Sequence, residues 1–341
     1  MENDKIKFHL PDYIGHFMMN RLFVMNLKEH PEWFYPDIEI GSIYGSFMGA
    51  IWNGGRVMVG GISNAVEIDY VYKVFNDYGV PLRHTFTNKL IKGNLVYDTY
   101  CNLIMQKGHN GLNEVLVNTD ELEVYIRETY PKYPIISSTT KRIKSVEEVE
   151  KEAAKDYKLV VLDYSLNRNL DIFMLPDKER YEILINAYCC DDCPVRSLHY
   201  TEMAEDQLSF GSGTPGREPR SCQYIADDFY TAQENRKDTL KVEEVYGFYA
   251  ENGFRNFKIE GRTTNMPDVL ESYIYYMVKP EFKDRVRLKM LKGILMPWDS
   301  RDASNATSER FSKLGTTSIK IITRKTIPVK EVHLSRYFIC K

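Results

Sequence analysis

The chain has 341 residues, of which 43% are hydrophobic and 27% charged, and its formal net charge at pH 7 is −3. These values exclude a disordered or fibrous chain and give no overall positive charge that would favour nucleic-acid binding. The first ten residues are polar and charged, unlike a signal peptide, and no run approaches the ~18 apolar residues needed to span a membrane. We therefore expect a soluble, cytoplasmic protein.

Short β-prone runs recur along the chain, and most are followed by a turn and a segment of helical character. Helices are predicted over 120–129 and 145–155, and the second has Ser145 three residues before Glu148, which is the spacing of a capping box. The eight predicted strands are, in chain order, 37–41, 56–60, 82–87, 114–118, 134–137, 159–163, 182–186 and 256–260.

Eight strands alternating with helices predict a closed α/β structure, a (β/α)8 barrel of the TIM type, with a doubly wound open sheet as the alternative. The strand runs are almost continuously apolar, as in parallel sheets covered on both faces. We expect the barrel domain to span 1–295, with the stretch before the first strand packed across the barrel floor and an ordered insertion at 189–230 after the seventh strand. A C-terminal extension, 296–341, contains a predicted β-hairpin with strands at 316–322 and 327–332.

Polar side chains gather at six of the predicted strand ends. In barrels of this type the functional groups project from the C-terminal ends of the strands and from the loops after them. Each polar residue alone is explained by ordinary turn chemistry, because Asn and Thr favour turns, but together they favour a polar pocket. The candidate substrate-binding residues are Thr87, Asn88, Asn118, Thr139, Asp163 and Asn186.

Cysteines form the strongest local signal. Three of the six lie within five positions, at Cys189, Cys190 and Cys193, and Cys222 follows. Thiolates at this density suit an iron–sulfur cluster or a structural zinc ion, and the alternative is a set of reduced cysteines without metal. A four-ligand zinc site would need Cys190 or His199 to complete it. The spacing excludes the cysteine triad of a radical-SAM enzyme.

The order Asn186-x-x-Cys189-x-x-x-Cys193-Pro194-x-Arg196, followed by Lys258-Ile-Glu-Gly-Arg262, resembles peptidase family U-thirty-two, or U32. This family contains collagenase-like peptidases and the iron–sulfur proteins of oxygen-independent ubiquinone and RNA hydroxylation. The resemblance covers roughly residues 37–276 and implies a barrel fold.

The resemblance implies a four-iron four-sulfur cluster held by Cys189, Cys193 and Cys222, with zinc as the alternative metal. The fourth ligand departs from the family pattern: Cys190 is adjacent to Cys189 and would bind the same cluster only with strain, and His199 is the other possible fourth ligand. A non-cysteine ligand or an open iron is therefore implied, together with a divergent branch of the family.

Three functions are kept as hypotheses. The first is an iron–sulfur barrel enzyme resembling the hydroxylation proteins, acting on a small aromatic or nucleic-acid substrate, with Lys258, Glu260 and Arg262 as catalytic residues at the barrel mouth. The second is a collagenase-like peptidase, although no nucleophile–histidine–acid set is visible. The third is a non-catalytic, metal-stabilised subunit with a heteromeric partner of the same family. The Lys- and Arg-rich segment 279–292 is the sequence hint of an RNA partner, and a solvated helix face is its alternative reading.

Overall fold

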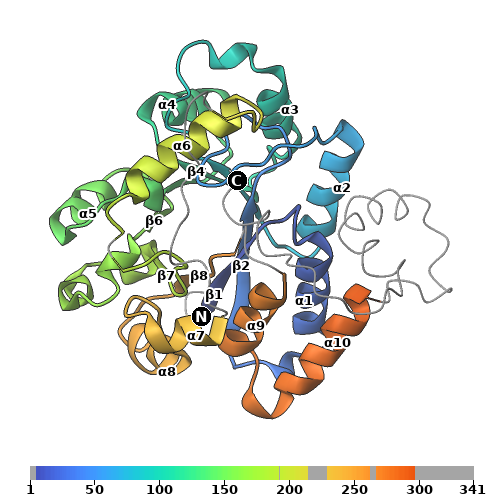
Figure 1. Ribbon diagram of the computed structural model, residues 1–341, viewed down its shortest axis with the longest axis vertical. Helices are drawn as coiled ribbons and strands as arrows, with labels where there is room; N and C mark the ends of the chain where they lie inside the picture. Colours follow the sequence, from blue (N-terminus) through green and yellow to red (C-terminus); the bar gives the residue numbers. More distant parts are fainter. Residues whose placement is uncertain (1–4, 192, 214–228, 262–265, 296–341) are drawn as a thin grey trace, which may run out of the picture.

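The computed structural model describes residues 5–191, 193–213, 229–261 and 266–295. Within them, eight parallel strands pair in chain order and the last pairs with the first, so the sheet closes into a barrel (Figure 1). The strands are β1 (Ile6–Pro11), β2 (Ile38–Gly45), β3 (Leu82–Phe86), β4 (Glu114–Val117), β5 (Ile135–Ser137), β6 (Leu159–Val161), β7 (Tyr181–Leu184) and β8 (Asn256–Lys258).

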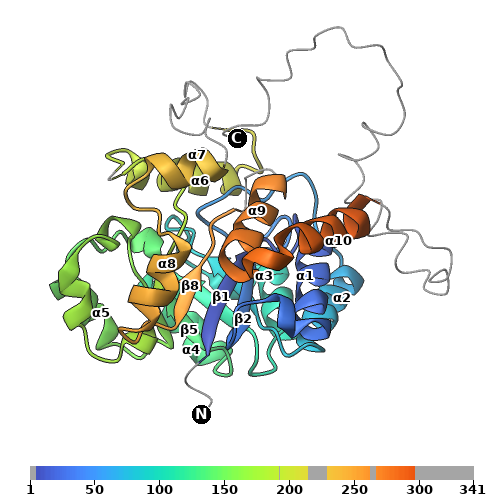
Figure 2. The same ribbon diagram turned by 90° about the horizontal axis from the view of Figure 1, so that it is seen from below.

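Helices follow most strands and cover the outside of the barrel (Figure 2). Between β6 and β7 the described chain forms the short 3-10 helices η5 (Tyr164–Leu166), η6 (Leu170–Met174) and η7 (Lys178–Arg180), and a π-helix, η8 (Val245–Ala250), precedes β8. The α-helices are α1 (Phe17–Glu29), α2 (Ala65–Asn76), α3 (Thr99–Lys107), α4 (Asp120–Thr129), α5 (Val146–Ala153), α6 (Arg196–Leu208), α7 (Phe229–Asn235), α8 (Val242–Glu244), α9 (Met266–Met277) and α10 (Lys283–Leu295).

The closed (β/α)8 barrel confirms the fold predicted from the strand count. The predicted helix at 120–129 is α4, and the one at 145–155 is α5, which ends two residues earlier than expected. Ser145 caps α5 as predicted, because its side chain accepts a hydrogen bond from the Glu148 backbone N–H at 3.3 Å. Outward-facing strand residues such as Phe8 and Phe257 are fully buried beneath the helices.

The predicted strand at 56–60 is wrong, because this segment lies in the loop between β2 and α2. Met58 in this segment bonds to a side chain of α6 and not to a strand: its N–H donates to Gln207 Oε1 at 2.7 Å, and its carbonyl accepts from Gln207 Nε2 at 3.2 Å. Gly55 and Gly60, with φ of +74° and +106°, turn the backbone on either side. Alternating apolar residues therefore mark an extended loop here rather than a barrel strand.

The strand that closes the barrel is β1, so the expectation that the N-terminal stretch packs across the floor is also wrong. β1 pairs with β2 on one side and with β8 on the other. Its apolar residues Phe8 and Leu10 face the helices, whereas Lys7 and His9 face the barrel interior. The sequence pattern does not predict this strand because its inward positions are polar, whereas a strand covered on both faces is expected to be apolar throughout.

The connection between β7 and β8 carries α6 and α7, which lie across the end of the barrel to which the strands point (Figure 2). This is the position of the predicted insertion at 189–230, of which 214–228 lie outside the described residues. The extension 296–341, with its predicted hairpin, lies outside them as well. In the described ranges, no helix has the length and apolar character needed to cross a membrane.

Candidate functional site

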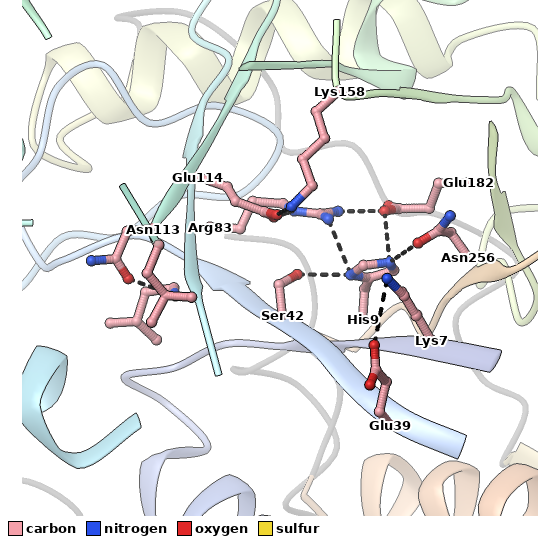
Figure 3. Close-up of polar contacts among 12 residues, drawn as sticks. Lys7, His9, Glu39, Ser42, Arg83, Asn113, Glu114, Lys158, Glu182 and Asn256 are labelled. Atoms are coloured by element: carbon pink, nitrogen blue, oxygen red, sulfur yellow. Dashed lines mark hydrogen bonds and ion pairs between the residues drawn. The ribbon is translucent and has the colours of Figure 1, made fainter. Parts of the chain in front are cut away.

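The barrel interior holds an ionic cluster, which we define as Arg83, Glu114, Glu182, Lys158 and Lys258. Figure 3 shows the first four, of which Arg83, Glu114 and Glu182 are fully buried and Lys158 is partly exposed. The guanidinium of Arg83 donates from Nε to Glu114 Oε2 at 2.7 Å and from Nη1 to Glu182. Lys158 pairs with the other oxygen of Glu114, on the side where the strands begin. Most barrels of this type fill these positions with branched apolar side chains. The charges here are tolerated because each has an opposite partner.

His9 lies beside the cluster as a neutral side chain. Arg83 can only donate, so its Nη2, 3.1 Å from His9 Nδ1, requires that nitrogen to accept. The ring proton is therefore on Nε2, which donates to Asn256 Oδ1 at 3.1 Å and lies 3.3 Å from Glu182 Oε2. Burial and the nearby Arg83 lower the pKa of His9 to about 3. Ser42 Oγ, 2.8 Å from Nδ1, also holds the ring in place.

Lys258 carries the cluster to the opposite end of the barrel, where the strands end. Its Nζ lies 3.4 Å from Glu182 Oε1 and 4.2 Å from the centre of the Tyr44 ring. Burial would raise the pKa of Glu182, but the positive charges of Arg83 and Lys258 lower it well below its ordinary range. Glu182 is therefore an ionised carboxylate that positions the Lys258 ammonium beneath the barrel mouth.

The mouth contains a pocket of about 60 Å³. Charged, hydroxyl and aromatic side chains from the strand ends, the loop after β2 and helix α6 line it together. The polar lining residues are Tyr44, Arg56, Thr85, Thr87, Ser138, Thr139, Thr140, Arg196, Tyr200, Lys258 and Glu260.

Glu260 is the one carboxylate among these lining residues. Its Oε1 accepts from Arg56 Nη2 at 2.7 Å, and its Oε2 accepts from the Tyr188 backbone N–H at 3.1 Å. Asn186 holds the Glu260 backbone, because its Oδ1 accepts from the Glu260 N–H at 2.7 Å and its Nδ2 donates to the Glu260 carbonyl at 3.2 Å. The carboxylate is thus aimed at the pocket by contacts from two other loops.

Arg196, at the start of α6, is a buried cation for which the described residues supply no carboxylate partner. It is 3% exposed, its Nε donates to the Tyr200 hydroxyl at 2.8 Å, and its guanidinium carbon lies 4.2 Å from the centre of the Tyr164 ring. Its Nη1 finds no hydrogen-bond partner among the described residues, and no ion pair to it forms within them. A buried charge left in this state is costly unless a ligand completes it.

Two of the predicted substrate-binding residues, Thr87 and Thr139, line this pocket. The others lie outside its lining and hold the loops around it. Asn88 is fully buried and donates to the carbonyls of the β2 loop and α6, and Asn118 donates to Thr140 Oγ1 at 2.7 Å. Asp163 caps η5 and pairs with a loop arginine. Asn186 positions Glu260, as described above.

The predicted metal ligands are only partly described. Cys189 and Cys193 are half-buried free thiols at the rim of the mouth, whereas Cys222 and the predicted catalytic Arg262 lie outside the described residues. Burial raises the pKa of Cys189, while Arg196 lowers it and Glu260 raises it. No group of three His, Cys, Asp or Glu side chains in the described ranges is placed to hold a metal ion. The described chain alone therefore does not form the expected cluster site.

Sequence reasoning missed the roles of Arg56, Arg196 and Tyr200. Arg56 begins the wrongly predicted strand at 56–60. Arg196 and Tyr200 belong to the stretch around the cysteines, to which only a metal-binding function was assigned. Only the crossing of α6 over the barrel end brings these side chains to Lys258 and Glu260. A sequence signal was present in the Cys193-Pro194-x-Arg196 spacing, but nothing in it showed that the guanidinium would be buried and unpaired.

No protein-family model matches this sequence, and no curated protein matches it. The chain is similar to a solved structure, that of the U32 peptidase Mk0906, with 13% sequence identity and a TM-score of 0.45. The likeness covers 76% of this chain and 94% of the other. That protein is a member of the family that the cysteine and lysine motifs resemble. The barrel assignment itself rests on the closed eight-stranded sheet.

Proposed function

We propose that the protein is a barrel enzyme whose active site is the C-terminal mouth, and that its substrate is a small molecule carrying one anionic group. The observation that carries this proposal is Arg196, a buried guanidinium that lines the pocket and whose Nη1 has no hydrogen-bond partner among the described residues. Arg56, Arg196 and Lys258 supply three positive charges there against the one carboxylate of Glu260. A guanidinium is well suited to carboxylate and phosphate groups because its donors match their geometry.

The size of the pocket sets what can enter it. A volume of about 60 Å³ holds roughly four water molecules at ~15 Å³ each, which suits a single carboxylate or phosphate group. Tyr44 and Tyr200 line the pocket, and the rings of Tyr44 and Tyr164 pack against Lys258 and Arg196, which holds these two cations in place. In this arrangement Arg196 anchors the anion, Lys258 stabilises developing negative charge, and Glu260 is the candidate proton acceptor.

The proposal is tested by titrating the protein with acetate and with inorganic phosphate, and binding is measured by calorimetry and by thermal unfolding. We expect saturable binding of at least one anion, and at least tenfold weaker binding in Arg196→Met. The control is Arg127→Gln, which removes a guanidinium from the outer face of α4 and should leave the affinity unchanged.

Stability separates a binding role from a structural one in the same variant. Replacing an unpaired buried charge by an apolar side chain is often neutral or stabilising, so Arg196→Met should unfold within about 1 kcal/mol of the wild type. A loss above about 3 kcal/mol would show that Arg196 is a structural group, and the proposal would fail.

An iron–sulfur enzyme resembling the hydroxylation proteins is the second candidate, supported by the placement of Cys189 and Cys193 on the same rim as Glu260. Anaerobic purification with iron and sulfide analysis tests it. We expect visible absorption that is lost in Cys189→Ser and Cys193→Ser and kept in Cys101→Ala, a buried cysteine of α3. A colourless protein containing one zinc ion per chain would instead support the structural-zinc alternative and the role of a partner subunit.

The peptidase and RNA alternatives have less support. The mouth pocket is too small for a polypeptide segment, and none of the described residues that line it is a histidine. On α10, Arg287 pairs with Glu271 at 2.5 Å, Lys289 lies 3.6 Å from Glu29, and Arg285 lies over the Trp33 ring. These cations are engaged within the chain, which favours the solvated helix face over an RNA-binding surface.

A further inference from the structure

A second and larger cavity opens at the other end of the barrel, where the strands begin. Its volume is about 700 Å³, within the range of ~300–1,000 Å³ of small-molecule sites. It shares no lining residue with the mouth pocket. Residues from β1, β2, β4, β6 and β8 line it together with Val24, Leu27 and Lys28 of α1, so it extends from the start of the barrel to the neighbouring face of α1.

The cavity exists because the sequence does not fill this end of the barrel. The pairing of β1 with β2 shifts after Phe8, which lies opposite Ile40, while His9 lies opposite Ser42. Gly41 is therefore the extra residue of a β-bulge, a feature that recurs beside functional sites. A Cβ atom on Gly41 would approach His9 Cε1 to 2.6 Å, so only glycine leaves room for the inward-facing imidazole.

The roof of the cavity is rigid and polar. His9, Glu114 and Asn256 line it, all are at most 4% exposed, and all are held by hydrogen bonds to the ionic cluster or the backbone (Figure 3). Asn256 Nδ2 donates to the Glu179 carbonyl at 2.7 Å, while its Oδ1 accepts from His9. Groups held in this way need no rearrangement to receive a ligand.

Positive charge dominates the walls of the cavity. Six cationic residues line it against three carboxylates, Glu39, Glu114 and Glu179. Glu39 lies 3.4 Å from Lys5 and 3.5 Å from Lys7, and Glu114 is shared between Lys158 and the buried Arg83. The lining residues therefore carry three more positive than negative charges. The cationic ones are Lys5, Lys7, Lys28, Lys158, Arg180 and Arg255. A cleft lined by one sign of charge concentrates ligands of the other sign.

We propose that this cavity is a second ligand site, separate from the mouth, that binds a small polyanion carrying two or more phosphate or carboxylate groups. The excess positive charge of the walls and the volume favour such a ligand over an apolar or a cationic one, whereas the roof, which includes the Glu114 carboxylate, limits how deep an anionic group can reach.

Calorimetric titration with inorganic pyrophosphate and with citrate, at low and at physiological salt, tests the site. We expect saturable binding of at least one of them that weakens with salt, and at least tenfold weaker binding in the double variant Lys7→Gln with Lys158→Gln. Preference for pyrophosphate would assign a phosphorylated ligand, and preference for citrate a polycarboxylate. Lys28→Gln, an exposed wall residue, gives a milder test if the double variant does not fold.

Two controls locate the ligand. Lys73→Gln removes a lysine from the outer face of α2 and should not change the affinity. Arg196→Met should leave polyanion binding intact, because Arg196 belongs to the mouth. Equal loss in Lys73→Gln would show non-specific attraction, and loss in Arg196→Met would place the polyanion at the mouth. Either result, or the absence of saturable binding at millimolar pyrophosphate and citrate, would overturn this proposal without touching the proposed function.

Discussion

At the scale of single residues, two buried histidines make the fold sensitive to acid. His84, on the outer face of β3, is fully buried between two tyrosines. The Tyr72 hydroxyl donates to the Ile104 carbonyl, so it must accept from His84 Nε2, and the Tyr13 hydroxyl donates to Nδ1 at 2.9 Å. Burial lowers the pKa of His84 to about 3, as it does for His9. Both rings are neutral in the folded protein at pH 5.

We predict that the free energy of unfolding falls as the pH is lowered from 7 to 5. In the unfolded chain a histidine takes up a proton below about pH 6.5, whereas folded His84 stays neutral down to about pH 3. The unfolded state therefore binds more protons in this window, and stability is lost as the pH falls through it. Each such histidine contributes about 2 kcal/mol of loss between pH 7 and 5.

Urea unfolding of the wild type and of His84→Gln at both pH values measures this. The variant is expected to be less stable at pH 7, since the tyrosine contacts change, but to lose about 2 kcal/mol less than the wild type on going to pH 5. An equal pH-dependent loss in the two proteins would show that His84 is not the group responsible.

At the scale of elements, the loop between β2 and α2 delivers Arg56 to the mouth by packing against the end of β3. The Gly54 N–H donates to the Thr85 carbonyl at 3.1 Å, and the Asn88 N–H donates to the Trp52 carbonyl at 3.0 Å. A Cβ atom on Gly54 would lie 2.4 Å from the Thr87 carbonyl carbon. Backbone atoms cannot move aside as a flexible side chain can, so the loop requires glycine at this position.

We predict that Gly54→Ala moves the loop away from β3 and breaks the ion pair between Arg56 and Glu260. The expected result is at least fivefold weaker binding of the anion at the mouth, together with a loss of stability of about 1–3 kcal/mol from the forced backbone shift. Gly61→Ala is the matched control, because no atom lies within 4 Å of a Cβ built there. Titration measures the anion affinity of both variants and thermal unfolding their stability. Equal affinity and equal stability in the two variants would show that the loop tolerates the extra methyl group.

Elements also show what the sequence could and could not predict. The sequence predicts β4 and β7 correctly. Their outward side chains are apolar and their inward ones are mixed, and such a run is still β-prone. β1 was missed because Lys7 and His9 alternate with its apolar residues, and 56–60 was wrongly predicted because Val57 and Val59 resemble a strand. Glu114 and Glu182 begin predicted strands, and a charged residue there usually faces solvent. Their burial depends on Arg83, which only barrel closure brings near.

At the scale of the whole molecule, the ionic cluster joins the two ends of the barrel. Lys158 lies at the cavity where the strands begin, Lys258 lies at the mouth, and between them Glu114, Arg83 and Glu182 form a continuous chain of ion pairs. The sequence predicted the polar mouth from strand ends but not this chain, because its members are far apart along the chain and meet only inside the closed sheet. A substitution at one end of the cluster should therefore change the energetic effect of a substitution at the other end.

Charge counting in this cluster gives the direction of that effect. Three cations, Arg83, Lys158 and Lys258, accompany the two carboxylates Glu114 and Glu182, so the intact cluster has one excess positive charge. Loss of either lysine leaves it balanced. Loss of both leaves two buried carboxylates sharing one guanidinium, and an uncompensated buried charge is strongly destabilising. The second substitution should therefore cost more than the first, whichever lysine is removed first.

We predict that Lys158→Gln and Lys258→Gln are non-additive in the free energy of unfolding, with the double variant less stable than the sum of the single losses by about 0.5–3 kcal/mol. A double-mutant cycle by urea unfolding at pH 7 measures this term. The matched cycle pairs Lys258→Gln with Lys73→Gln, whose lysine forms an exposed ion pair on α2, and should be additive within about 0.5 kcal/mol. Additivity in both cycles would show that the two ends of the barrel are energetically independent. Arg83 would then stabilise Glu114 and Glu182 to the same extent whether or not the lysine at the other end is present.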